Sequence, residues 1–214
     1  MSADSPSESP QRSLRRRLAH LPWTRAGAVR VVVPVVAVLA LVQARLPATM
    51  IAPQLRALEA TDGPVALLFG TVVGIAAAFG VVEPSDAVWR MAVPTRRLAG
   101  QLRVVMLVGL YLGIIAVGAP GQVAASAVVV LTATSEALLS TVVVGYRMAW
   151  VVPGLHAALS GLLGARLFGD LAWWAWPARP DPSVGSVVLG VVALLVGLVV
   201  VRLRGTAGSL PRLG

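Results

Sequence analysis

Six apolar stretches, each close to the length of a bilayer crossing, dominate this chain of 214 residues. A helix that spans the hydrocarbon core of a membrane needs about 20 mostly apolar residues. The stretches carry few or no charges and run over residues 28–44, 63–82, 104–120, 123–146, 149–165 and 183–201. The sequence therefore predicts an all-α, polytopic membrane protein with six transmembrane helices.

Composition agrees with this prediction and limits the domain organisation. The chain is 57% hydrophobic and 13% charged, with a mean hydropathy of +0.83, which does not suit a water-soluble fold. We expect a disordered cytoplasmic tail over 1–26, a membrane domain over 27–203 and a cytoplasmic tail over 204–214. The loops are too short for a soluble catalytic domain, so we expect no enzyme activity and no cofactor in this chain.

The formal net charge of +9 comes from 18 basic residues, all of them arginine. In a soluble protein such a charge would suggest nucleic-acid binding, but here the arginines divide by membrane side. Fourteen fall on the side that holds both termini, and four fall on the other side: Arg45, Arg56, Arg166 and Arg179. The positive-inside rule then places both termini in the cytoplasm. We expect a multi-pass protein of the cytoplasmic membrane, in contact with lipid and without a nucleic-acid partner.

Features between the stretches refine this topology. Residues 43–62 are expected to form an extracytoplasmic loop with one helical turn, and the short turns at 118–122 and 146–148 predict tight helical hairpins. Three of six tryptophans gather at 173–176, a pattern typical of the outer headgroup level. Small residues recur at one-turn spacing, as at Gly70, Gly74 and Ala78. They predict close packing between helices or subunits, with a role in lining a substrate path as the alternative.

The loop between the second and third stretches contains an arginine-bearing amphipathic segment at 83–98. Residues 86–93 would form a short helix in the interface plane, and Pro94 would end it. Thr95 would then cap the helix that enters the membrane, with Arg96 and Arg97 in its first turn. The alternative is an ordinary basic cytoplasmic loop.

This loop resembles that of ABC-2-type exporter permeases, in the order Glu83, amphipathic helix, Val-Pro-Thr-Arg-Arg-Leu-Ala-Gly-Gln-Leu, apolar span. The resemblance implies a coupling helix that docks on a separate ATPase subunit, which binds the ATP, and a homodimer or heterodimer of permeases. It implies export of a hydrophobic or amphiphilic substrate such as a drug, peptide or lipid. The residues expected to meet the ATPase are Asp86, Trp89, Arg90, Met91, Arg96 and Arg97.

The fourth stretch carries an ionisable residue, Glu136, at mid-depth, aligned with Thr132 and Ser140 at four-residue spacing. Such a group in a membrane is a functional candidate by default. His156, in the fifth stretch, could meet Glu136 across the helical hairpin. Together they would contact a substrate cation or carry protons. The alternative is a protonated glutamate bonded to the neighbouring hydroxyls, with His156 bonded to a carbonyl.

Other functions are less well supported by the sequence. With His20 and His156 as the only histidines and no cysteine, no metal centre is expected. Ser160 lies one helical turn after His156, but no Gly-x-Ser-x-Gly sequence supports a serine nucleophile. Two alternatives to the exporter permease stay open. One is a six-helix solute-binding or proton-coupled transporter that uses Glu136, and the other is a non-transport membrane anchor subunit.

Overall fold

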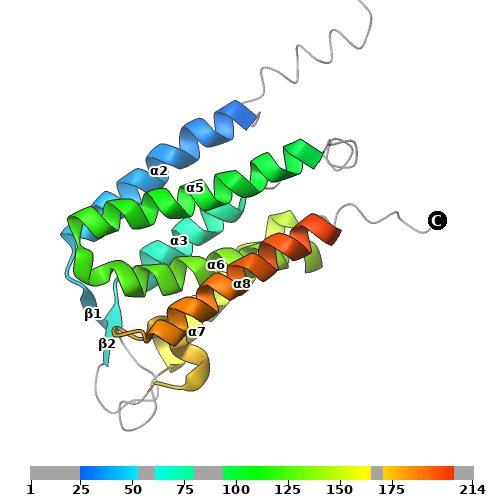
Figure 1. Cartoon of the computed structure of the whole chain (residues 1–214). Helices are drawn as coiled ribbons and strands as arrows, with labels where there is room; N and C mark the ends of the chain where they lie inside the picture. Colours follow the sequence, from blue (N-terminus) through cyan, green and yellow to red (C-terminus); the bar gives the residue numbers. More distant parts are fainter. Residues whose placement is uncertain (1–24, 53–60, 80–93, 165–170, 205–214) are drawn as a thin grey trace, which may run out of the picture.

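The fold is a bundle of apolar helices with a small sheet at one end, as seen in a computed structural model that describes residues 25–52, 61–79, 94–164 and 171–204 (Figure 1). The described residues form α2 (Arg25–Arg45), α3 (Ala66–Phe79), α5 (Pro94–Gly118), α6 (Val123–Val143), α7 (Val151–Leu163) and α8 (Val184–Arg204). Each of these helices overlaps one predicted apolar stretch. The chain is therefore mainly helical, as predicted.

Three of the described helical regions are long and apolar enough to cross a membrane, namely Gly100–Gly118, Pro120–Val143 and Val184–Leu203. Three further apolar helical regions, Val31–Arg45, Ala66–Phe79 and Val151–Leu163, are shorter. At about 1.5 Å per residue, the 13 residues of α7 cover roughly 20 Å of a hydrocarbon core about 30 Å thick. Six complete crossings therefore remain a prediction.

Helix α6 lies at the centre of the bundle. Of its spanning region, 78% is buried inside the protein, against 33% for α5 and 22% for α8. It packs against α3 and α8 with different faces, and it also touches α5 and α7. Most buried hydroxyls of α6 donate within the helix; for example, Thr134 Oγ1 donates to the carbonyl of Val130 at 2.6 Å. Ser135 Oγ instead donates to the carbonyl of Ala193 in α8 at 2.7 Å. This is how a polar residue can lie inside an apolar bundle at low cost.

Glycines set the distance between α3 and α6. A Cβ added to Gly70 would lie 2.9 Å from Val129 Cγ1, and one added to Gly74 would lie 2.8 Å from the backbone nitrogen of Thr134. Gly190 of α8 similarly faces Leu131, where an added Cβ would lie 3.2 Å from the leucine Cβ. Small residues permit this close approach of helix backbones. The predicted packing role of the small-residue ridge in the second stretch is thus confirmed.

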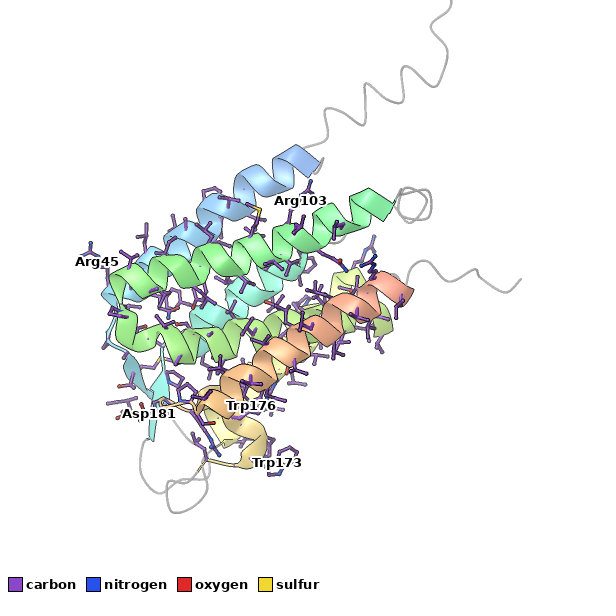
Figure 2. The ribbon with its side chains drawn as sticks, viewed as in Figure 1. Arg45, Arg103, Trp173, Trp176 and Asp181 are labelled. Atoms are coloured by element: carbon purple, nitrogen blue, oxygen red, sulfur yellow. The ribbon has the colours of Figure 1, made fainter. Side chains whose placement is uncertain are left out.

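The helices define two ends of the bundle. At one end, which we call the Arg103 end, α2 and α5 begin, α8 ends, and α6 turns into α7 (Figure 1). Gln101 Nε2 there donates to the carbonyl of Leu198 at 3.0 Å. At the opposite end, which we call the hairpin end, α2 ends, strands β1 and β2 pair, and α5 turns into α6 (Figure 1). Arg45, Trp173, Trp176 and Asp181 lie toward the hairpin end, and Arg103 lies toward the other (Figure 2).

Two local details differ from what the sequence predicts. The region predicted as a loop contributes two antiparallel strands that were not expected, β1 (Thr49–Ala52) and β2 (Thr61–Pro64), with Thr49 opposite Pro64. Residues 53–60 lie outside the described residues, so the helical turn expected in this loop stays a prediction. Thr95 does not cap α5, because the helix already begins at Pro94. Proline suits the first helical position, where its missing N–H would have no partner within the helix. The predicted terminal tails lie almost wholly outside the described residues.

Candidate functional site

The structure brings Glu136 of α6 and His156 of α7 into direct contact. The imidazole Nδ1 of His156 lies 2.5 Å from Glu136 Oε1. The two helices are consecutive, and the turn at 144–150 folds α7 back along α6. Two ionisable side chains from separate apolar helices therefore meet inside the bundle.

The second ring nitrogen of His156 determines how the pair shares its proton. Nε2 lies 3.0 Å from the main-chain carbonyl of Trp174, and a carbonyl oxygen can only accept a hydrogen bond, so Nε2 carries hydrogen. The contact with Glu136 then contains one proton, held either by Nδ1 or by the carboxyl oxygen. The pair has no net charge in either arrangement, which lowers the cost of placing it among apolar helices.

The ionisable pair is only partly buried. The side chains of His156 and Glu136 are 23% and 21% exposed, respectively. A cavity of about 10 Å³ adjoins both, with Pro153 and Pro177 among its walls. That volume admits about one water molecule. Partial burial reduces the screening of a charge by solvent, so a proton or a cation at this pair would interact more strongly than at a fully exposed site.

The predicted stripe of Thr132, Glu136 and Ser140 lies along α6, but both of its hydroxyls donate hydrogen bonds to main-chain carbonyls of the same helix. Thr132 Oγ1 donates to the carbonyl of Val128 at 2.8 Å, and Ser140 Oγ donates to the carbonyl of Glu136 at 2.7 Å. Both residues are buried. The partner of the Glu136 carboxyl group is therefore His156 and not a neighbouring hydroxyl.

A groove runs between α3 and α7 beside this pair. Its volume is about 420 Å³, and its walls are mostly apolar. Leu67, Thr71 and Ala157 belong both to these walls and to those of the small cavity at Glu136 and His156. One layer of side chains thus separates the groove from the ionisable pair.

The residues predicted to meet an ATPase can be followed only in part. Asp86, Trp89, Arg90 and Met91 lie outside the described residues. Arg96 and Arg97 lie in the first turn of α5, at the Arg103 end. The coupling role of all six residues stays a prediction.

A buried polar cluster at the hairpin end was not predicted. Gln43 Nε2 donates to Gln122 Oε1 at 3.2 Å and to Ser126 Oγ at 2.8 Å. The hydroxyl of Tyr111 donates to Gln43 Oε1, and Gln122 Nε2 donates to the carbonyl of Leu46 at 3.0 Å. The signal in the sequence was the presence of these polar side chains within or beside apolar stretches. The cluster joins α2, α5 and α6.

Ser160 lies one helical turn after His156 on α7, and the structure shows its surroundings. Both ring nitrogens of His156 are engaged by Glu136 and Trp174, and not by Ser160. The buried hydroxyl of Ser160 has no hydrogen-bond partner among the described residues. The same residues contain no group of three or more metal-ligating side chains.

Comparisons with models of protein families, with curated proteins and with solved structures found no match.

Proposed function

We propose that this chain is the permease subunit of an ATP-driven, ABC-2-like exporter of the cytoplasmic membrane. It would move a hydrophobic or amphiphilic substrate and work with a separate ATPase and a second permease. The observation that carries the proposal is the apolar groove of about 420 Å³ between α3 and α7. Ligand sites are typically concave, mostly apolar and between about 300 and 1,000 Å³ in volume.

The ends of the described helices also support the proposal. Helix α3 ends at Phe79 and α5 begins at Pro94, so the predicted coupling segment connects the groove-lining helix α3 to α5. A force applied there by an ATPase would be transmitted along α3 to the wall of the groove. Of the two helices that line the groove, α7 is better suited to move, because it packs less extensively on the rest of the bundle than α3 does.

A second candidate function rests on the contact between Glu136 and His156. A proton-coupled carrier needs an ionisable group that can exchange its proton beside the substrate path. The pair contains one shared proton and lies one layer of side chains from the groove. In this candidate the substrate moves without an ATPase, and Glu136 couples its movement to protons.

Purification of the full-length protein from its native membranes in mild detergent tests the exporter proposal. We expect a soluble chain with ATPase motifs to co-purify. Trp89→Asp and Arg90→Glu should each abolish co-purification. Arg45→Glu, which reverses a charge at the hairpin end of the bundle, should preserve it. Failure of the unsubstituted protein to retain any ATPase would contradict the proposal.

Reconstitution of the purified chain alone tests the carrier. Uptake of ethidium into liposomes, driven by an imposed pH gradient and lost in Glu136→Gln, would favour the second candidate. Absence of gradient-driven uptake, together with an ATPase in the purified complex, would favour the exporter.

A further inference from the structure

The groove between α3 and α7 carries a charge at the hairpin end. Asp62 lies on β2 opposite Ile51 of β1, and both residues line the groove. Among the described lining residues Asp62 is the only ionisable one. Its side chain is exposed, and no described residue forms an ion pair with it. The groove is therefore apolar along the helices and negative at one end.

Thr71, the other polar side chain of the described lining, contributes little to this polarity. Its hydroxyl donates to the carbonyl of Leu67 at 2.6 Å within α3, so its hydrogen is already used. Small residues on the opposite wall, among them Gly154 and Ala158 of α7, leave room between the helices. The shape and chemistry fit an alkyl chain beside the helices and a cationic group at Asp62.

In a membrane, the alkyl chain and the headgroup of an amphiphile contribute differently to selective binding. An alkyl chain is as well solvated by lipid as by leucine and valine, so its transfer into the groove gains little free energy. Selection must then come from the headgroup. A cation at Asp62 is attracted, an anion is repelled, and an uncharged headgroup gains no electrostatic energy there.

We propose that the groove between α3 and α7 binds a single-chain amphiphile with a cationic headgroup, whose chain lies between the helices and whose headgroup lies at Asp62. Binding itself does not depend on the proposed export function. The identification of this ligand class as the transported substrate does rest on it.

Binding of radiolabelled tetradecyltrimethylammonium to the full-length protein in phosphatidylcholine nanodiscs tests the proposal. Tetradecyl sulfate and tetradecyl maltoside serve as competitors with the same chain and other headgroups. We expect the cation to bind most tightly. Asp62→Asn should weaken its binding by about 2- to 5-fold, the range expected for an exposed ion pair. Asp181→Asn removes another exposed carboxylate at the same end, outside the groove, and should have no effect.

Blocking variants test the position of the alkyl chain. Ala158→Trp on α7 and Val72→Trp on α3 fill the groove from its two walls, and each should abolish binding of all three amphiphiles. Ala116→Trp introduces the same side chain at an exposed position of α5 that does not line the groove, and it should bind normally. A thermal melt identifies any variant that fails to fold. If one blocking variant does not fold, the other one tests where the alkyl chain lies.

Any one of three results would overturn the proposal. Equal affinity for the three headgroups, or equal effects of Asp62→Asn and Asp181→Asn, would remove the role of charge. Normal binding by a folded blocking variant would place the ligand elsewhere. Charge-selective binding without a co-purifying ATPase would retain the site and reject export. An ATPase complex without such binding would retain export and reject this ligand class.

Discussion

Gly74 of α3 and Thr134 of α6 are so close that a Cβ at position 74 would lie 2.8 Å from the backbone nitrogen of Thr134. Backbone atoms cannot move aside as the end of a flexible side chain can. Gly74→Ala should therefore force the helices apart and cost about 1–3 kcal/mol, as overpacking typically does. Thermal unfolding in detergent measures the loss.

Gly113 provides the matched control for that substitution. It lies in α5, and a Cβ added there would meet no atom within 4 Å. Gly113→Ala should leave the melting temperature unchanged or raise it, because alanine favours a helix more than glycine does. Equal melting temperatures for the two alanine variants would contradict the close packing of α3 and α6.

Substitutions at Glu136 distinguish the contribution of its hydrogen bond with His156 to stability from that of its ionisable proton. In Glu136→Gln the amide can donate to Nδ1 of His156, since Nε2 carries the ring hydrogen. This variant should retain stability to within about 1 kcal/mol. Glu136→Leu leaves Nδ1 unpaired and should cost about 1–3 kcal/mol. Thermal melts of both variants test this, and a leucine variant as stable as the glutamine variant would contradict the pairing.

The hydrogen bond between Tyr111 and Gln43 should couple α5 to α2. We expect Tyr111→Phe and Gln43→Leu each to destabilise the protein, since each leaves a buried polar atom without its partner. In the double variant the losses should not add. The coupling energy should be about 0.6–1.7 kcal/mol, as for hydrogen bonds between membrane helices. Additive losses in chemical or thermal unfolding would show that the two side chains act independently.

The proposed orientation can be tested without background labelling, because the chain contains no cysteine. Gly121→Cys places a thiol at the hairpin end, and Met148→Cys places one at the Arg103 end; both positions are exposed. The positive-inside rule predicts that the hairpin end lies outside the cell. A membrane-impermeant maleimide should label position 121 in intact cells and position 148 only after permeabilisation. The reverse pattern would invert the topology.

Local sequence predicts the helices of this protein well because their signals are local. An apolar run of sufficient length favours a helix wherever it lies in the chain. The positions of α5, α6 and α8 follow from such runs. Because the turn before α7 is short, the sequence also predicted that His156 could reach Glu136.

Contacts between distant residues required the tertiary structure. The partner of His156 Nε2 is the carbonyl of Trp174, from beyond the end of α7. The strands β1 and β2 pair across residues 53–60, and neither shows a strong strand pattern alone. The cluster around Gln43 joins residues 68 to 83 positions apart.

The sequence by itself determined that the chain is apolar, mainly helical and asymmetric in charge, since these properties depend on runs of neighbouring residues. Only the tertiary structure decided which helix faces meet, because a rotation of α6 by one residue, about 100°, would turn Glu136 away from His156. The groove between α3 and α7 likewise exists only through packing, since its walls come from segments that are far apart in the chain.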